Sequence, residues 1–450
     1  MESIVLTIQI FHQGHWHDAA ELTLKQPQLG RSSAVRLGYD FDYALQWLAR
    51  DDEHACSLAL PIELMIPNDA TSWFGFLDDI VPAGAARRYW INQLGLANAS
   101  SGKQDTELLC KGTIAPVGNL RIKEALPELP AGSRLKQRRF PIAEVVERNT
   151  DFLEYAQQMG ATSGGATGAG GEAPKLLLRC SADDEVWIDT FQDDVLNPDE
   201  HYLVKFPRNN RSAIDCDILR AEYHYYQELQ SLGMSTISTH NMRLIEGEYF
   251  PSLWLPRFDV AMVNGQLTRY GLESVYSVLN KAPGSYLDQA ATLRNILNML
   301  EQQYRVTEQG NEFNRQAFVI EWVKRDLLNV VFGNSDNHGR NTALLKKPDG
   351  IWLSPIYDFA PMKADPEMVP RTMTWGSPLE EGGNYNWQLI AERLADLVEP
   401  PLLLAELGQL AQQLTGLKQR LEHRGVPERI IRMPVIGFDY LDKKLQGWQL

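Results

Sequence analysis

Three polar side chains on one short loop are the residues best suited to chemistry. Asp336, His338 and Asn341 lie in "NSDNHGRN" (334–341), which follows the apolar run "AFVIEWVKRDLLNVVFG" and precedes the strand-like "TALL". Asp336 and Asn341 are five positions apart, which is the interval between the Asp and the Asn of the protein-kinase catalytic loop. A carboxylate in that place takes or orients the proton of an attacking hydroxyl. We therefore predict that the loop is a site and not only a turn.

A second acidic residue is expected to return to this loop. The segments "TALLKK", "PDG" and "IWLSPI" predict a hairpin that brings Asp358 of "YDFAPM" back beside Asn341. Mg²⁺ prefers hard oxygen ligands and usually takes one or two carboxylates together with substrate phosphates. Asn341 and Asp358 are therefore the predicted metal ligands, with Mg²⁺ and ATP as the predicted cofactors.

A glycine-rich segment could hold phosphates. "GATSGGATGAGGEAPK" (160–175) contains six glycines before residue 172, and small residues let backbone N–H groups close on an anion. A linker would show the same composition. Neither GxxxxGK[ST] nor a GxGxxG that leads into a helix is present. By itself, the segment does not decide between an anion site and a linker.

A lysine and a glutamate follow in the order that a nucleotide site needs. Lys205 lies on the apolar strand pattern "HYLVKFP", and Glu222 lies within a predicted helix that runs from an N-cap at Ser212 to a stop at Gly233. An edge-strand lysine that reaches water would look the same. A strand lysine paired with a helix glutamate is how protein kinases hold the α- and β-phosphates. The connector at 254–258 is where a kinase-like hinge would meet adenine.

The elements that would position these groups fall into three regions. Residues 1–140 begin with alternating strand patterns, 141–260 hold the glycine-rich segment and further strands, and 261–450 contain mainly helical patterns. We expect an α+β fold with two kinase-like lobes. Region 141–260 is the predicted β-rich nucleotide-binding lobe, and region 261–450 is the predicted α-helical catalytic lobe.

Composition excludes several classes of protein. The formal net charge of −15 argues against a chain that coats nucleic acid, although a local basic patch stays open. Four cysteines without CxxC spacing indicate neither a zinc site nor a disulfide framework, and they fit a reducing compartment. The first residues lack the basic region of a signal peptide, and no apolar run is long enough to span a membrane. We expect a cytoplasmic protein.

A run of three histidines, "HQGHWH" (12–17), raises the question of a metal site. Side chains on strands about a turn alternate between opposite faces, and no acidic ligand lies at a supporting spacing. The sequence therefore does not predict a metal there.

Together, the functional segments resemble the HipA-type toxin kinases of bacterial toxin–antitoxin modules. The D-x-H-x-x-N core at 336–341 is highly specific to that family, and the other blocks extend the resemblance over roughly 160–365. Residues 1–140 match more loosely, through "SLALPI" and "WFGFLDDIVP", and resemble the family's N-terminal subdomain. The matching blocks are "GGEAPK" (170–175), "YLVKFP" (202–207), the helix from Glu222 to Gly233, "PRFD" (256–259), "GNSDNHGRN" (333–341) and "PIYDFAP" (355–361).

The resemblance implies an ATP- and Mg²⁺-dependent serine/threonine protein kinase with a two-lobed HipA-like fold. It also implies a HipB-like helix-turn-helix antitoxin that makes the main operator contacts, an aminoacyl-tRNA synthetase as substrate, and growth arrest. A kinase-fold enzyme acting on a small molecule or a lipid head group would use the same residues, and this alternative stays open. The implied catalytic residues are Asp336 and His338, and the implied ATP-binding residues are Gly170, Gly171, Lys175, Lys205, Glu222, Pro256, Arg257, Phe258, His338 and Asn341.

One position departs from the family pattern. The family usually carries a serine in the glycine-rich loop, seven residues before the loop lysine, and autophosphorylation of that serine ejects the loop. Counting back seven from Lys175 reaches Gly168. Thr167 and Ser163 are the nearby hydroxyls that could take its place, so they are the candidate autophosphorylation sites.

Overall fold

The structure of the chain is a computed structural model, and it divides into two compact units, each made of several stretches of sequence. The first unit comprises Met1–Asn209, His240–Pro283 and Ala343–Trp352, and the second comprises Asn210–Thr239, Gly284–Thr342 and Leu353–Leu450. The residues that the structure describes are 2–114, 116–129, 133–159, 174–191, 194–208, 210–304, 313–448 and 450.

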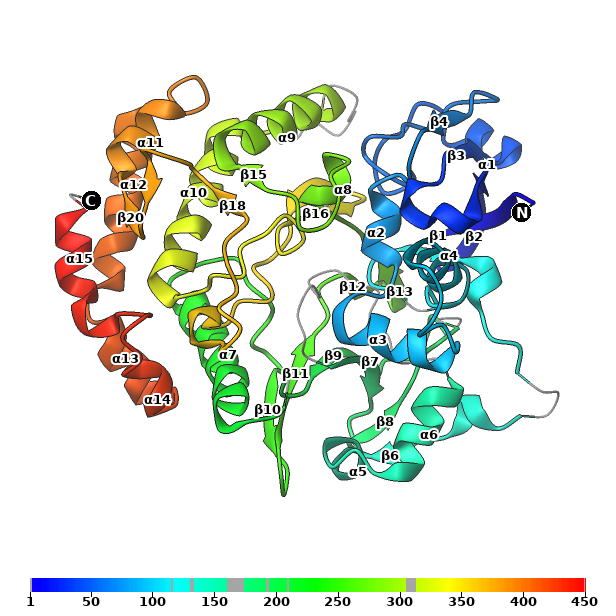
Figure 1. Cartoon of the computed structure of the whole chain (residues 1–450), viewed down its shortest axis with the longest axis horizontal. Helices are drawn as coiled ribbons and strands as arrows, with labels where there is room; N and C mark the ends of the chain where they lie inside the picture. Colours follow the sequence, from blue (N-terminus) through cyan, green and yellow to red (C-terminus); the bar gives the residue numbers. More distant parts are fainter. Residues whose placement is uncertain are drawn as a thin grey trace. The chain divides into compact units, whose positions relative to one another are not determined.

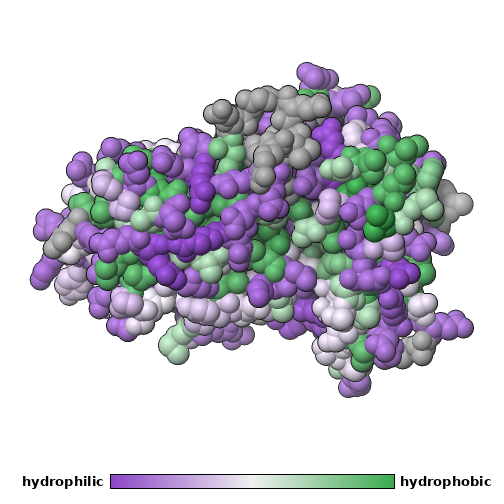
Figure 2. Space-filling view, turned by 90° about the horizontal axis from the view of Figure 1, so that it is seen from above, coloured by the Kyte–Doolittle hydropathy of each residue, from purple (hydrophilic) through white to green (hydrophobic). Residues whose placement is uncertain are grey.

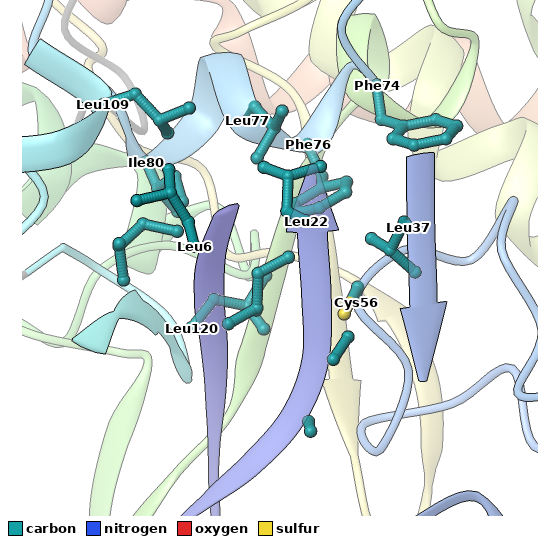
Figure 3. Close-up of a cluster of buried hydrophobic side chains, with 14 of the residues drawn as sticks. Leu6, Leu22, Leu37, Cys56, Phe74, Phe76, Leu77, Ile80, Leu109 and Leu120 are labelled. Atoms are coloured by element: carbon teal, nitrogen blue, oxygen red, sulfur yellow. The ribbon is translucent and has the colours of Figure 1, made fainter. Parts of the chain in front are cut away.

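The first unit starts with a five-stranded antiparallel sheet in the order β4-β3-β2-β1-β5. Apolar side chains of its strands pack against helices α2 (Phe76–Ile80) and α4 (Ser101–Lys111) in one buried cluster. Figure 3 shows Leu6 and Leu22 from the strands beside Leu77 from α2. The predicted strands about "QGH" are confirmed. The strands are β1 (Ile4–His12), β2 (His15–Leu24), β3 (Val35–Tyr39), β4 (Asn68–Ala70) and β5 (Leu120–Ile122).

The histidine run at the turn of this sheet has two of its side chains on one face. His12 at the end of β1 pairs with His15 across the turn, so His17, two positions further along β2, lies diagonally on the same face as His12. The two imidazole rings stack with centroids 3.8 Å apart and planes 2° apart. The expectation that these side chains alternate between faces is therefore wrong for this pair.

A second sheet of the same unit, in the order β10-β11-β9-β7-β8-β6, carries the predicted phosphate-binding lysines. Phe152 and Tyr155 of α6 (Thr150–Gln158) pack with Leu178 and Trp254 of the sheet in its core. Trp254 is therefore a core residue. The strands are β6 (Phe140–Pro141), β7 (Lys175–Cys180), β8 (Glu185–Trp187), β9 (Glu200–Lys205), β10 (Arg243–Glu246) and β11 (Pro251–Pro256).

The hairpin predicted after the polar loop is present. Strands β16 (Ala343–Lys347) and β17 (Gly350–Leu353) are neighbours in a three-stranded sheet with β14 (Gly271–Ser274). This hairpin returns the chain toward Asp358, as the sequence indicates.

The second unit is mainly helical (Figure 1). Its first helix, α7 (Ala213–Ser231), begins at Ser212, whose side chain forms a capping box with Asp215. Gly233 follows the helix with a φ of 74°, a left-handed conformation that suits glycine. Both predicted boundaries are confirmed. The other main helices are α9 (Gln289–Tyr304), α10 (Arg315–Phe332), α11 (Trp387–Arg393), α12 (Pro400–Leu414), α13 (Leu417–Arg424) and α15 (Leu441–Gly447).

The hydropathy of the surface and the state of the cysteines agree with the sequence composition in two respects, polarity and disulfide bonding. Hydrophilic side chains predominate on the face shown in Figure 2, with hydrophobic ones in smaller areas between them. All four cysteines are free thiols. Among the described residues, we find no helix with the length and hydropathy needed to cross a membrane.

Candidate active site

Helix α10 delivers the polar loop from a rigid base. Its apolar face is buried, and it ends at Gly333, whose φ of 70° is left-handed. The backbone N–H groups of Gly333 and Asn334 both donate to the carbonyl of Asn329, which closes the last turn. Asn334, Asn337 and Arg340 of the loop are buried. A polar loop this deep requires internal partners, because buried polar groups that lack them are costly.

Asp326 supplies the first of these partners from within α10. Its carboxylate is 2% exposed and accepts hydrogen bonds from Asn337 Nδ2 at 2.9 Å, Arg371 Nη2 at 2.8 Å and Trp375 Nε1 at 2.7 Å. Burial by itself would lower the pKa of Arg371, but the Asp326 carboxylate and its neighbours raise that pKa above its usual value. Asp326 therefore ties the middle of the loop to a buried cation and an indole.

The same loop residue is held from its other side. The carbonyl of Asn337 accepts the backbone N–H groups of Thr372 and Met373, both at 3.1 Å. Asn337 thus bridges the helix before the loop and the segment near residue 372. These bonds also fix the backbone position of the neighbouring Asp336.

The side chains of Asp336 and His338 lie in contact. His338 Nε2 lies 3.2 Å from Asp336 Oδ1, and His338 Nδ1 accepts the backbone N–H of Arg340 at 3.2 Å. Because Nδ1 is an acceptor, the neutral ring carries its proton on Nε2, toward Asp336. The imidazole therefore orients the carboxylate, and both side chains keep some exposure to solvent, 17% for His338 and 12% for Asp336.

Asn341 presents an oxygen with the properties of a metal ligand. Its Nδ2 donates to the Asp336 carbonyl at 2.8 Å, and its backbone N–H donates to the His338 carbonyl at 2.9 Å. Asn341 Oδ1 is buried and has no hydrogen-bond partner among the described residues. Asp336 and Asn341 line a small cavity of about 30 Å³ together with Tyr357 and Phe359, which is room for a water or an ion. A hard carbonyl oxygen in such a place fits Mg²⁺.

Asp358 lies in sequence between Tyr357 and Phe359, two residues that line this cavity and are held by hydrogen bonds. The hydroxyl of Tyr357 donates to the Arg340 carbonyl at 2.5 Å, and the backbone N–H of Phe359 donates to the hydroxyl of Tyr226 at 3.3 Å. Asp358 itself has a φ of 52°. Left-handed backbone is uncommon for residues other than glycine and gathers at functional sites. The structure thus brings the Asp358 segment to the Asp336 loop.

Glu222 is connected to that segment through a tyrosine. It is buried on α7, and its Oε1 accepts the Tyr226 hydroxyl at 2.9 Å. Burial raises the pKa of Tyr226, and the Glu222 and Asp358 carboxylates raise that pKa further. The tyrosine therefore stays a neutral donor to Glu222 and an acceptor for Phe359, so it connects helix α7 to the Asp358 segment.

In the first unit, the two predicted lysines face the same edge of the second sheet. Lys175 on β7 lies directly opposite Lys205 on β9, and Lys205 is buried. The backbone N–H of Phe206 donates to the carbonyl of Pro174 at 3.1 Å, so the pair lies where the glycine-rich segment enters the sheet. Phosphate contacts of Lys175 and Lys205 stay predictions. The pairing of Lys205 with Glu222 stays a prediction.

The predicted hinge residues have a mixed role. Arg257 follows the end of β11, and its Nε and Nη2 bind the two carboxylate oxygens of Asp259 at 2.9 and 2.5 Å. Asp259 also accepts the Gly118 N–H at 2.6 Å. The Arg257 guanidinium is thus committed to a buried ion pair, which keeps the pKa of Asp259 low despite burial. Nucleotide contacts of Pro256, Arg257 and Phe258 stay predictions.

The glycine-rich segment lies outside the described residues. Four predicted site residues fall within it, namely Ser163, Thr167, Gly170 and Gly171.

Sequence reasoning missed the residues that hold the loop. Asp326 had a signal, because it occupies the same helical face as Val319, Trp322 and Val323, all of them buried, and a carboxylate on an apolar face needs a partner. Arg371 and Trp375 had none, since nothing in their spacing relates them to α10.

Residues 167–416 match the HipA-like C-terminal domain, which is more than half of the chain. The chain belongs to the HipA-like family. Its fold is similar to that of HipA from Shewanella oneidensis MR-1, solved with HipB and operator DNA, with a TM-score of 0.62 at 15% identity over 99% of this chain and 97% of that one. The predicted α+β, HipA-like fold is confirmed.

A curated relative is similar over a shorter stretch. Toxin YjjJ of Escherichia coli K12 is 29% identical over 197 residues, which are 43% of this chain and 38% of the relative. The matched part thus spans well under half of the length of that relative.

Proposed function

We propose that this HipA-like chain is an ATP- and Mg²⁺-dependent serine/threonine protein kinase and the toxin of a toxin–antitoxin module. The observation that carries the proposal is the Asp336–Asn341 loop. Its one carboxylate, Asp336, lies beside the imidazole of His338, and Asn341, which lines the same small cavity as Asp336, has a buried Oδ1 without a hydrogen-bond partner among the described residues. A turn with only a structural role would use that oxygen internally.

Each of these residues has a separate proposed role in phosphoryl transfer. Asp336 accepts the proton of a serine or threonine hydroxyl on the substrate while the oxygen of that hydroxyl attacks the γ-phosphorus of ATP. The bond between the γ-phosphorus and the β–γ bridging oxygen breaks, and ADP leaves. Asn341 and Asp358 would hold Mg²⁺, which when bound neutralises charge on the phosphates. Lys175 and Lys205 are the proposed phosphate-binding lysines. Orientation by His338 keeps the Asp336 carboxylate aimed at the acceptor.

The proposed partners are a HipB-like helix-turn-helix antitoxin, which would make the main operator contacts, and an aminoacyl-tRNA synthetase as the protein substrate. Support for the antitoxin comes from the fold, because the Shewanella HipA that this chain resembles was solved with HipB and operator DNA. We propose that growth arrest follows from phosphorylation of the synthetase.

Transfer from γ-labelled ATP to a lysate tests the proposal. Purified wild-type chain should label a protein band, and Asp336→Ala should not. Asp349→Asn is the matched control, because Asp349 is an exposed acidic residue of the β16–β17 hairpin. Label in a small molecule or a lipid would point to the alternative kinase-fold activity, and transfer that is equal in wild type and Asp336→Ala would refute the assignment of the loop.

A further inference from the structure

Tyr226 lies where helix α7 meets the segment that carries Asp358. Its side chain is fully buried, so the hydroxyl is the one polar group that this ring brings into the interior of the second unit. The hydroxyl accepts the backbone N–H of Phe359 at 3.3 Å and donates to Glu222 Oε1 at 2.9 Å. Because an amide N–H can only donate, the hydroxyl proton is left for the carboxylate. Both of these hydrogen bonds therefore form together.

The N–H that Tyr226 accepts belongs to the peptide unit that follows Asp358. Asp358 has a φ of 52°, a left-handed conformation that residues other than glycine seldom adopt and that persists only where surrounding contacts hold it. On the other side of Asp358, the Tyr357 hydroxyl donates to the Arg340 carbonyl at 2.5 Å. The direction of the Asp358 side chain follows from this backbone conformation. A group that holds the Phe359 N–H therefore helps to set where the carboxylate points.

The ring of Phe359 is held separately, by aromatic packing. It lies 5.3 Å from the ring of Phe332, the last residue of α10, and 6.1 Å from the ring of Tyr225. The Tyr225 hydroxyl donates to the Phe332 carbonyl at 3.2 Å. Tyr225 thus joins α7 to the helix before the catalytic loop, whereas Tyr226 joins α7 to the backbone beside Asp358.

Two carboxylates near Tyr226 determine the state of its hydroxyl. Burial raises the pKa of Tyr226, and Glu222 and Asp358 raise that pKa further, so the phenol stays protonated. A neutral hydroxyl can hold the backbone without placing a third negative charge beside the two carboxylates. Removing an outer residue that orients a metal ligand typically costs about 10–100-fold in metal affinity or activity.

We propose that Tyr226 is a positioning residue for the metal ligand Asp358, because its hydroxyl fixes the backbone that aims the carboxylate at Mg²⁺. This inference rests on the proposed function, in which Asp358 and Asn341 hold Mg²⁺. Tyr226 acts only through Asp358. Loss of its hydroxyl should therefore change how nucleotide binding depends on Mg²⁺ and leave the nucleotide affinity without Mg²⁺ unchanged.

Tyr226→Phe tests the proposal, and Tyr225→Phe is its matched control. Both tyrosines are fully buried on α7, and each substitution removes one hydrogen-bonded hydroxyl and keeps the ring. Binding of a non-hydrolysable ATP analogue would be titrated at several Mg²⁺ concentrations, at a temperature where urea unfolding shows that all proteins are folded. We expect Tyr226→Phe to need about 10–100-fold more Mg²⁺ for the same analogue affinity. Tyr225→Phe should follow wild type, and all three proteins should bind the analogue equally without Mg²⁺.

Phosphoryl transfer gives a second readout. The Mg²⁺ concentration for half-maximal transfer should rise in Tyr226→Phe and not in Tyr225→Phe, and excess Mg²⁺ should restore most of the rate. A wild-type Mg²⁺ dependence in Tyr226→Phe, or an equal shift in both variants, would overturn the positioning role while leaving the proposed function in place. Analogue binding that does not depend on Mg²⁺ in the wild-type chain would refute the proposed function, and this inference with it.

Discussion

Replacing Asp326 by asparagine tests how the catalytic loop is held. The carboxylate has donors on both oxygens, with Asn337 and Arg371 on Oδ1 and Trp375 on Oδ2. Asparagine keeps the shape but has one acceptor oxygen, so at least one buried donor loses its acceptor, at about 1–3 kcal/mol. The lost charge adds to this, although Glu380, 3.0 Å from Arg371 Nε, still balances part of the cation. Breaking a buried pair costs about 3–5 kcal/mol in full, so we expect the variant to lose about 3 kcal/mol.

The assay combines urea unfolding with phosphoryl transfer. If Asp326 positions the loop, Asp326→Asn should lower kcat about 10²-fold at a temperature where it is fully folded, because a shift of about 1 Å at the reacting group costs that much. KM for ATP should change little. Glu321→Gln on the same helix is the control, since Glu321 makes a partly exposed pair with Arg325 and should cost less than about 1 kcal/mol. A folded Asp326→Asn variant with a wild-type kcat would refute the positioning role.

Three further predictions address the metal, regulation and pH. Asp358→Asn should weaken Mg²⁺-dependent binding of an ATP analogue more than Asn341→Ala, because Asp358 brings a full charge and Asn341 only a dipole; titrations at several Mg²⁺ concentrations that give the reverse order would count against these roles. Mass spectrometry after incubation with Mg-ATP should find phosphate on Thr167, or next on Ser163, with a fall in ATP affinity as the added charge of about −1.5 to −2 competes with the nucleotide phosphates; an unmodified 161–175 peptide beside a phosphorylated substrate would show that this switch is lost. Burial and nearby arginines hold the pKa of His201 well below its usual value, so the unfolded chain takes up this proton first as the pH falls. The free energy of unfolding should therefore decrease below about pH 6.5, by about 2 kcal/mol at pH 5. Unfolding of wild type and His201→Gln at pH 5 and 7.5 should show a smaller loss of stability in the variant, and equal losses would exclude His201 as the cause.

Local patterns predicted the parts of the site that depend on neighbouring residues. The Asp336–Asn341 interval, the hairpin before Asp358 and the cap at Ser212 are each encoded within about twenty residues, so turn chemistry and strand periodicity were sufficient to find them. The helix cap and the hairpin form in the structure because helix-capping and turn signals act between neighbouring residues.

Long-range contacts were beyond that reasoning. Arg371 reaches Asp326 from 45 positions along the chain, and Phe359 reaches Tyr226 from 133. Such pairs form because packing brings distant strands and helices together, and neither periodicity nor spacing records it. The face of a helix is a partial exception, since the carboxylate of Asp326 on an apolar stripe indicates a buried partner without identifying it.

The rate of a single phosphoryl transfer tests the central claim most directly. The experiment compares wild type with Asp336→Asn and Asp349→Asn. Each protein would be saturated with γ-labelled ATP and mixed with the protein substrate identified in the lysate experiment, and its nucleotide affinity would be measured in parallel. We expect Asp336→Asn to bind ATP as wild type does but to transfer phosphate about 10²–10⁴-fold more slowly, as loss of a positioned base does, with Asp349→Asn unchanged. Transfer by Asp336→Asn at the wild-type rate would contradict the assignment of this loop as the catalytic centre.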